Sequence, residues 1–383
     1  MAQWLILHAS GVHGHVTVAL SAGIGIFGAA FVLSWSAEAA QVDIPPALSI
    51  AFIALIAVLP EYAVDIYFAW EAGKDPAYVH YATANMTGAN RLLIGAGWPV
   101  VLFAYWWKTR NDSITLEEEQ RTELGYLLAA TAYSFIIPLK GTLSPVDGVV
   151  LIALFGAYMV AAARAGLVEP ELEGPAEMIA RLPTTRRRAV CGTLFAAAGL
   201  TIFVAAEPFA EALLGIGEQF GIDRFLLVQW LAPLASESPE FIVAILFAVK
   251  GKPGAGFSAL VSSKVNQWTL LVGMLPLVYI LSLGHFSPMH LDARQSHEIL
   301  LTSAQSLFAV VLLADFKLSM PEALALLILF SVQLAWPDAT VRLIFVVIYL
   351  VAAIAMVLGR ARTRAGVLGM IRAGIGAVRT STG

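Results

Sequence analysis

Two Pro-Glu pairs lie inside apolar stretches of this sequence, at Pro60-Glu61 and at Pro239-Glu240. A charged residue at the centre of a membrane helix costs about 2.5–3.5 kcal/mol on insertion scales, so a repeated one suggests a function. Proline has no N–H, and it leaves a carbonyl without its helical donor. Carboxylate and carbonyl oxygens together form a hard site suited to Ca2+ or Na+. The alternative is that each glutamate is protonated or paired and purely structural.

Small and polar residues follow each pair, in the sequences ATANMTGAN (82–90) and SALVSSKVNQ (258–267). Small residues permit close approach of helices, and the amide oxygens of Asn85 and Asn90 can complete a cation shell. The alternative role for these amides is hydrogen bonding between helices. Ser263 offers a hydroxyl in the second stretch, although serine is also a common packing residue in membrane helices.

Lys264 places a positive charge in the second polar stretch. Near the two Pro-Glu glutamates and Glu237, its ammonium can stand in for a bound monovalent cation. Opposite charges keep a lysine protonated and desolvation opposes this, so a lysine in this position is a candidate proton carrier. The alternative is a permanent ion pair with Glu237. Arg91 cannot be deprotonated, and we expect it to pair with Asp65 or with a backbone carbonyl.

The composition predicts the elements that position these residues. The 383-residue chain is 59% hydrophobic and 13% charged, whereas soluble domains carry about 25% charged residues. Apolar blocks long enough to cross a bilayer must be helical, because a helix satisfies its own backbone. The sequence predicts an all-α membrane protein of about eleven helices, near 15–35, 47–73, 77–107, 121–139, 146–166, 188–216, 223–250, 254–283, 296–314, 319–336 and 340–359.

The charges of the loops predict the orientation. Most of the 23 lysines and arginines fall in alternate loops and in the C-terminal tail, which predicts that these are cytoplasmic. We therefore expect a first transmembrane repeat at 1–166, a cytoplasmic loop at 167–188, a second repeat at 189–336, and an extra helix with a basic cytoplasmic tail at 337–383. The N-terminus is predicted to lie outside the plasma (inner) membrane. The tail either rests on anionic lipid or is disordered.

The two Pro-Glu helices are five helices apart, so they cross the membrane in opposite directions. Inverted repeats of this kind are typical of secondary transporters, whose substrate sites lie near the bilayer midplane where the repeats meet. Neither a set of catalytic residues nor a cofactor motif is present, which argues against an enzyme. Cys191 is the only cysteine, so an intrachain disulfide is excluded. Neither nucleic acid nor a cofactor is expected, and the partners are the transported cations and membrane lipid.

The paired segments PE…GKDP…ATANMTGAN and SPE…GKP…SSK resemble the two alpha repeats of the sodium/calcium exchanger family. The resemblance implies that Glu61 and Glu240 bind the transported ion together with polar residues of the following helices. Read without gaps from each glutamate, Asn85 and Lys264 both match the last Asn of the family pattern Gly-Ser-Asn, and Ser263 matches its Ser. An alignment with five extra residues in the first repeat instead places Asn90 there.

The chain also departs from the family pattern, since usual polar ligands are replaced at several positions: Val58, His80, Ala84, Glu237 and Ala259. The usual sodium sites look incomplete on either alignment. We therefore predict an antiporter with two inverted five-helix repeats and one extra helix, which exchanges a cation, Ca2+ by resemblance, against H+ or Na+. The alternatives are a transporter of another metal or an organic cation, and a channel or sensor with the same fold. The sequence leaves the oligomeric state open.

Overall fold

The computed structural model describes residues 14–43, 58–116, 120–164, 172 and 174–379. These residues form two compact units. The first comprises the described residues of 1–68 and 162–239, and the second comprises those of 69–161 and 240–383. Each unit thus combines segments from both halves of the sequence, and the helices that carry the Pro-Glu pairs run from one unit into the other.

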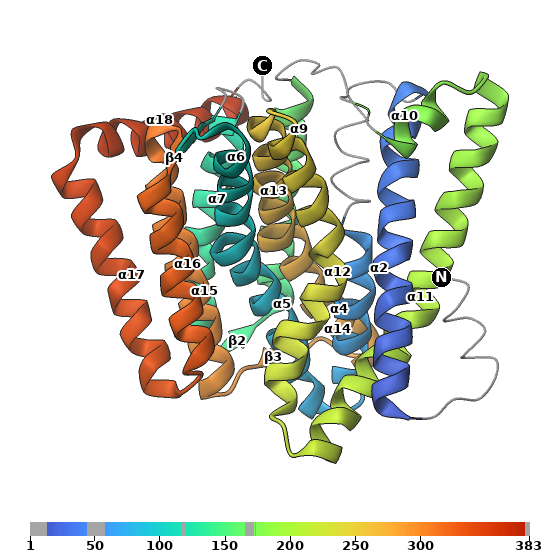
Figure 1. The fold of residues 1–383 in the computed structure, drawn as a ribbon. Coiled ribbons are helices and arrows are strands. Elements are labelled where there is room, and N and C mark those ends of the chain that lie inside the picture. Colours follow the sequence, from blue (N-terminus) through green and yellow to red (C-terminus); the bar gives the residue numbers. More distant parts are fainter. Residues whose placement is uncertain (1–13, 44–57, 117–119, 165–171, 173, 380–383) are drawn as a thin grey trace. The chain divides into compact units, whose positions relative to one another are not determined.

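The first unit is organised around two long helices, α2 (His15–Ala40) and α11 (Thr184–Phe220), which lie side by side in Figure 1. Their contact is built from small and aliphatic side chains, as expected for helices packed in lipid: Ala29, Leu33, Ala37, Ala198 and Ile202. A 3-10 turn (η1, Gln41–Asp43), the short helix α10 (Pro175–Ala180), and the first parts of α4 (Leu59–Ala72) and α12 (Arg224–Val249) complete this unit.

An ion pair fixes one end of the α2–α11 pair. Asp43 accepts hydrogen bonds from the guanidinium of Arg187, at 2.7 and 2.9 Å, and from Arg188 at 3.1 Å. The 37-residue α11 is about 55 Å long at 1.5 Å per residue, well beyond a hydrocarbon core of about 30 Å. At least one end of α11 therefore extends beyond the hydrocarbon core, and its start, with three consecutive arginines, falls within the loop that the sequence predicts at 167–188.

The second unit contains two copies of one helical segment. The first copy comprises α5 (Val79–Leu92), the π-helical segment η3 (Leu93–Gly97) and α6 (Trp98–Thr109). The second comprises α13 (Pro253–Asn266), η4 (Gln267–Leu271) and α14 (Val272–Leu283). Every boundary recurs 174 residues later in the sequence. The sequence predicts one uninterrupted helix in each copy, and the π segments are a correction to that prediction.

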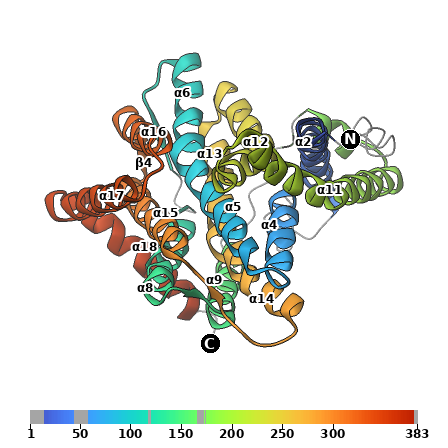
Figure 2. The same cartoon turned by 90° about the horizontal axis from the view of Figure 1, so that it is seen from below.

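Two further groups of helices lie around these copies. The first is α7 (Gln120–Ser134) with α8 (Ile136–Lys140) and α9 (Pro145–Arg164), whose last residues belong to the first unit. The second is α15 (Ala293–Leu312) with the 3-10 turn η5 (Leu313–Asp315) and α16 (Met320–Ala335). Local sequence fixes two of the starts, because Asp292 with Gln295 and Ser319 with Glu322 form capping boxes. Seen from below, α15 lies between α5 and α17 (Ala339–Gly359) (Figure 2).

Two short antiparallel β-ladders connect the copies. Strand β1 (Ser113–Thr115) follows α6 and pairs with β4 (Lys317–Ser319), whereas β2 (Thr142–Leu143) pairs with β3 (Met289–His290), which follows α14. In Figure 1, β4 lies at one end of the unit, and β2 and β3 lie at the other. The ends of the two copies therefore point in opposite directions, as an inverted repeat requires.

The predicted all-helical membrane fold is confirmed, apart from these short ladders. Among the described residues, eight helices are long and apolar enough to cross a membrane, and α16 is a shorter apolar helix. Each predicted helix has a helical counterpart, although residues 47–57 of the second lie outside the described residues. The number of eleven crossings stays a prediction.

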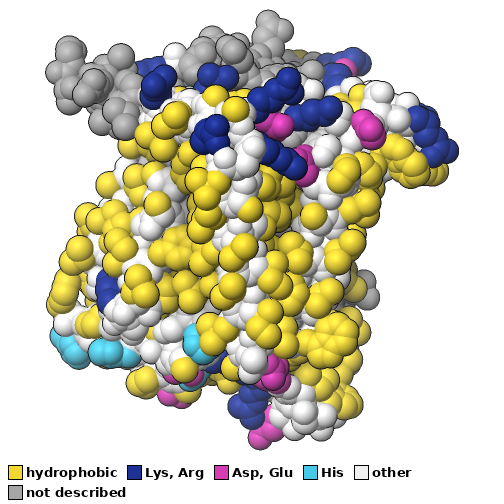
Figure 3. Space-filling view, turned by 90° about the vertical axis from the view of Figure 1, so that its left-hand side faces the viewer, with side chains coloured by type: hydrophobic (Ala, Val, Ile, Leu, Met, Phe, Trp, Pro, Cys, Tyr) yellow, Lys and Arg dark blue, Asp and Glu magenta, His cyan; other side chains and the backbone are white. Residues whose placement is uncertain are grey.

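The C-terminal tail forms a helix, α18 (Ala361–Arg379), so a disordered tail is excluded over this range. It packs on α7 and η5, and Gly366 lies so close to η5 that a Cβ would meet the carbonyl oxygen of Ala314. Figure 3 shows a broad hydrophobic band with lysines and arginines gathered at one edge. The exposed arginines of this helix, Arg362, Arg364 and Arg372, fit the expectation that the tail rests on anionic lipid, which stays a prediction.

A close glycine contact joins α9 to α14 and provides a test of the packing. A Cβ added at Gly148 would lie 2.4 Å from the carbonyl oxygen of Gly273, whereas Gly156 on the same helix has open space. We expect Gly148→Ala to destabilise the protein by about 1–3 kcal/mol, because the backbones must separate. Gly156→Ala is the control and should leave stability unchanged or slightly raised. Thermal unfolding in detergent measures both, and equal melting temperatures for the two variants would contradict this packing.

Candidate cation-binding site

The two Pro-Glu glutamates lie on helices whose first parts belong to the first unit and whose last parts belong to the second. Glu61 is in the first turn of α4 and is 2% exposed, and Asp65 is one turn later and fully buried. On α12, Glu237 is 2% exposed, whereas Glu240 is half-buried and has the Ser263 hydroxyl beside it. These are acidic side chains held within apolar helices, as the sequence predicts.

Proline changes the backbone beside Glu240. The helix α12 continues through Pro239, which has no N–H to give to the carbonyl of Ala235 four residues earlier. That oxygen is a backbone ligand of the kind that Ca2+ and Na+ accept. The equivalent carbonyl before Pro60 lies outside the described residues.

The element boundaries choose between the two alignments of the repeats. Because α5, η3 and α6 recur as α13, η4 and α14 with a constant spacing of 174 residues, Asn90 is equivalent to Lys264. Asn85 is then equivalent to Ala259. The gap-free alignment from the glutamates, which pairs Asn85 with Lys264, would displace every one of these boundaries by five residues. The alignment with extra residues in the first repeat is therefore the one the structure supports.

The two equivalent residues meet directly. The Lys264 ammonium donates to the side-chain oxygen of Asn90 at 2.6 Å and to its backbone carbonyl at 3.3 Å. It also lies over the Trp268 ring, 4.5 Å from the centroid. Lys264 and Asn90 are both fully buried. The Asn90 amide donates to the carbonyl of Met86 at 2.8 Å, which turns its oxygen toward the lysine.

A π segment begins three residues after each of these positions, at Leu93 and at Gln267. A π turn is wider than an α turn and is frequent at functional sites. It follows Asn90 in one copy and Lys264 in the other. Asn90 and Lys264 thus lie just before the points where the two copies depart from regular helix, and Asn85 is fully buried earlier in α5.

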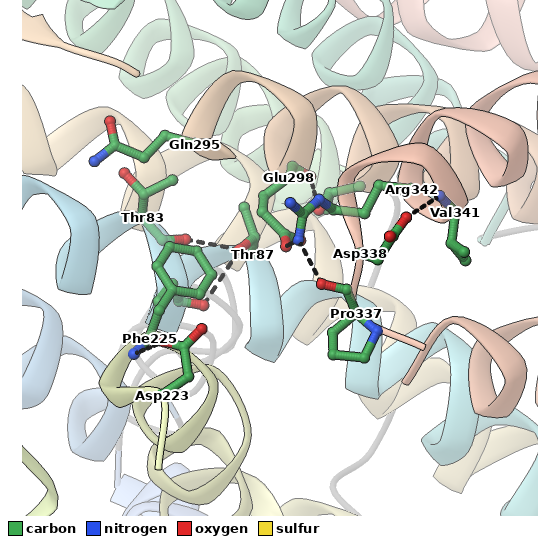
Figure 4. A network of polar contacts seen from close by, with 12 residues as sticks. Thr83, Thr87, Asp223, Phe225, Gln295, Glu298, Pro337, Asp338, Val341 and Arg342 are labelled. Atoms are coloured by element: carbon green, nitrogen blue, oxygen red, sulfur yellow. Dashed lines mark hydrogen bonds and ion pairs between the residues drawn. The ribbon is translucent and has the colours of Figure 1, made fainter. Parts of the chain in front are cut away.

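Arg91 has a partner that the sequence analysis did not name. Its guanidinium forms a 2.7 Å ion pair with Glu298 of α15, and the other oxygen of Glu298 is 3.2 Å from Arg342 of α17. Figure 4 shows Glu298 beside Arg342, which also donates to the carbonyl of Pro337 at 3.1 Å. The expected pairing of Arg91 with Asp65 stays a prediction. The signal for the cluster is the pair of arginines at apolar helix segments, but sequence alone does not say which carboxylate they share.

The model of the sodium/calcium exchanger protein family matches residues 14–164 and 192–337, which is most of the chain. This chain belongs to the sodium/calcium exchanger family. The family resemblance inferred from the Pro-Glu repeats is therefore confirmed, and the exchanger is a cation antiporter.

Solved structures give the same result for the fold. The exchanger is 45% identical to an H+/Ca2+ exchanger, CAX, over 98% of this chain and 95% of that one, with a TM-score of 0.94. A sodium-calcium exchanger, NCX_Mj, is 17% identical over 84% of this chain and 98% of that one, with a TM-score of 0.57. Native YfkE is 16% identical over 91% and 97%, with a TM-score of 0.63. No curated protein matches the sequence of the exchanger.

The exchanger should lose transport when either Pro-Glu carboxylate is neutralised. We expect Glu61→Gln and Glu240→Gln each to abolish cation flux in proteoliposomes, because an amide keeps the shape of the side chain but removes the charge that balances a cation. Glu71→Gln is the matched control, since Glu71 lies at the far end of α4 and pairs with Lys74 near the surface. Flux close to wild type in either of the first two variants would rule out a shared site.

Glu298→Gln should destabilise the exchanger, although Glu298 lies outside the Pro-Glu helices α4 and α12. The change leaves the guanidiniums of Arg91 and Arg342 beside a neutral amide, and breaking a buried pair of this kind costs about 3–5 kcal/mol. Adding Arg342→Met should recover part of this loss. Glu177→Gln, in an exposed pair with Arg181, serves as the control. Thermal unfolding in detergent measures the stability of these variants. Unchanged stability in Glu298→Gln would contradict a stabilising role for the Arg91–Glu298–Arg342 cluster.

Proposed function

We propose that this exchanger moves Ca2+ across the plasma (inner) membrane in exchange for H+, by alternating access. Glu61 and Glu240 are the central ligands of Ca2+, and Asn85, Glu237 and Ser263 supply further oxygens. The support is chemical, because carboxylate, amide and hydroxyl oxygens are the ligands that Ca2+ takes in proteins. The close similarity to an H+/Ca2+ exchanger agrees with this choice of ions.

The observation that carries the choice of H+ is the contact of Lys264 with Asn90. The amide oxygen of Asn90 could serve a small cation, but it accepts a 2.6 Å hydrogen bond from the lysine ammonium. A covalently attached cation thus occupies an oxygen of the kind that Na+ would need. Lysine, unlike Na+, can release a proton, and a fully buried lysine is readily shifted in its protonation. The predicted ion pair between Lys264 and Glu237 would work against that release.

A flux experiment separates this function from its rivals. The purified exchanger is reconstituted in proteoliposomes, and Ca2+ uptake is measured with gradients of H+, Na+ or K+ imposed one at a time. Uptake that follows the pH gradient without Na+ is the expected result. Uptake that needs Na+ would make this a sodium-coupled exchanger, and Ca2+ flux independent of any counter-gradient would indicate a channel. Transport of other cations, but not of Ca2+, would indicate a different substrate.

Lys264→Asn should weaken the coupling to protons. The variant has an asparagine at both equivalent positions of the two repeats, so the amide oxygen of Asn90 is released for a mobile cation. We expect the dependence of Ca2+ flux on pH to flatten and dependence on Na+ to emerge. Lys252→Asn is the control, because Lys252 is an exposed lysine just before α13. A pH profile identical to wild type would reduce Lys264 to a structural counter-ion.

The proposed orientation places the C-terminus in the cytoplasm. At one end of the second unit, the β1–β4 ladder and the neighbouring helix ends carry lysines and arginines: Lys108, Arg110, Lys317, Arg360 and Arg362. Positive charge of this kind is typical of the cytoplasmic face. Thr382→Cys on a Cys191→Ser background should resist an impermeant thiol reagent added to intact cells and should react after permeabilisation. Rapid labelling of intact cells would show that the C-terminus lies outside, which is opposite to the proposed orientation.

A further inference from the structure

Glu123 of α7, a half-buried glutamate outside the Pro-Glu helices, accepts hydrogen bonds from groups that the proposed exchange does not use. Its Oε1 atom accepts a hydrogen bond from the Ser262 hydroxyl of α13 at 2.8 Å and from the Tyr158 hydroxyl of α9 at 3.2 Å. These two hydroxyls are also 3.4 Å from each other. The carboxyl group thus joins three helices of the second unit through one oxygen.

The other carboxyl oxygen of Glu123 has a different environment. Oε2 is buried and accepts no hydrogen bond, and Glu123 forms no ion pair with any residue that the structure describes. Hydroxyl donors favour the ionised carboxylate, whereas burial without a countercharge favours the neutral acid. The two effects oppose each other at Glu123, and this is the condition under which a carboxyl group can bind and release a proton.

The remaining charged and titratable side chains on the surrounding helices contact residues other than Glu123 or point away from it. On α13, Lys264 points to Asn90, and on α7 itself Arg121 lies over the Phe316 ring and Tyr126 packs against Tyr158. No hydrogen bond or ion pair joins Glu123 to the other described charged or titratable side chains of α7 and of the helices packed on it: Tyr133 of α7, Lys140 of α8, Arg294, His297 and Glu298 of α15, and Arg362, Arg364 and Arg372 of α18. The ionisation of Glu123 is therefore governed by its two hydroxyl donors and its burial.

The position of Ser262 connects Glu123 to the candidate site. Three consecutive side chains of α13 reach three different helices: Ser262 reaches Glu123 on α7, Ser263 reaches Glu240 on α12, and Lys264 reaches Asn90 on α5. Consecutive residues on an α-helix point about 100° apart, which explains the three directions. A change at Glu123 that displaces Ser262 must also displace the neighbouring ligand and lysine.

We propose that Glu123 is a separate proton-binding site, distinct from the Pro-Glu glutamates, that adjusts cation exchange through α13. When ionised, the carboxylate holds the hydroxyls of Ser262 and Tyr158. When it takes a proton from water, its hold on these donors weakens and α13 is less constrained. The proton returns to water on release, so no other reactant is consumed. The regulatory part of this inference rests on the proposed exchange, but the proton binding does not.

The binding of the proton is tested without transport. Infrared spectra of the purified full-length exchanger are recorded against pH, and the C=O stretch of protonated carboxyl groups is compared between wild type and Glu123→Gln. The wild type should show a titrating band, equivalent to about one carboxyl group, that the variant lacks. Glu218→Gln, at an exposed glutamate whose side chain is 75% exposed, is the control. An identical set of titrating bands in wild type and Glu123→Gln would overturn the proposal.

Two further variants keep the carboxyl group and test its hydrogen bonds. Ser262→Ala and Tyr158→Phe each remove one donor to the ionised form, so the midpoint of the Glu123 band should move to higher pH by on the order of one unit. These variants also protect the test against a poorly folded Glu123→Gln protein. Midpoints equal to wild type in both variants would show that the hydroxyls do not control this group, and would overturn the proposal.

The regulatory part is tested by flux in proteoliposomes. The rate of Ca2+ exchange is measured while pH is varied on one side of the membrane only, the side where α7 begins at Gln120 and Arg121. Glu123→Gln should transport and should lose one step of the wild-type pH profile, which a merely structural role would not produce. A full wild-type profile in this variant would overturn the regulatory role. Absence of proton-coupled flux in wild type, with the infrared band intact, would refute the proposed exchange and leave the proton site standing.

Discussion

The hydrogen bonds from the Lys264 ammonium to Asn90 are the interaction on which the centre of the second unit depends. A charge inside a membrane helix must find its partners in the protein, because lipid supplies none. Lys264 finds two oxygens of one residue and the face of Trp268. Since Asn90 belongs to α5 and Lys264 to α13, separating these helices would leave a buried ammonium without these partners. The two copies of the repeat are thereby held against each other at equivalent positions.

The two copies share the same helix boundaries but differ in their side chains, and this difference underlies our proposal of proton coupling. The boundaries of α5, η3 and α6 recur in α13, η4 and α14, and the strand that follows each copy pairs with a strand from another part of the second unit. An inverted repeat of this kind supplies two related conformations from one architecture. At one pair of equivalent positions, however, an amide faces an ammonium. Our proposal of proton coupling rests on this departure from symmetry at Asn90 and Lys264.

The carboxylates of Glu298, which is buried, and Glu123, which is half-buried, show how the surroundings decide whether a charge is permanent. Glu298 lies between the guanidiniums of Arg91 and Arg342, which are always charged, so its own charge is compensated at all times. Glu123 has only the hydroxyls of Ser262 and Tyr158, and one of its oxygens is buried without a donor. Removing a proton from Glu298 creates an ion pair, whereas removing one from Glu123 creates a charge held only by two neutral hydroxyls, with no countercharge among the described residues. The first residue is therefore suited to stability and the second to a change of state.

The sequence by itself determined the membrane fold, the family and the two Pro-Glu pairs. Apolar length forces helices in lipid, and a carboxylate within such a helix is too costly to be accidental. Both signals are local, so they can be read along the chain. The β-ladders and the π segments were not predicted, because a five-residue departure from α-helix leaves no hydrophobic pattern of its own.

Only the tertiary structure decided which residues are equivalent and which charges are partners. The sequence offered two alignments, and the shared helix boundaries selected the one that pairs Asn90 with Lys264. It identified Arg91 as charged but not its partner Glu298, which lies far along the chain on α15, and it did not single out Glu123. A buried charge requires a partner near in space, and nothing in the chain order states how near two residues will lie. The free-energy cost of burying a charge can be read from the type of the residue. The partners that compensate this charge depend on contacts that form only when the helices pack.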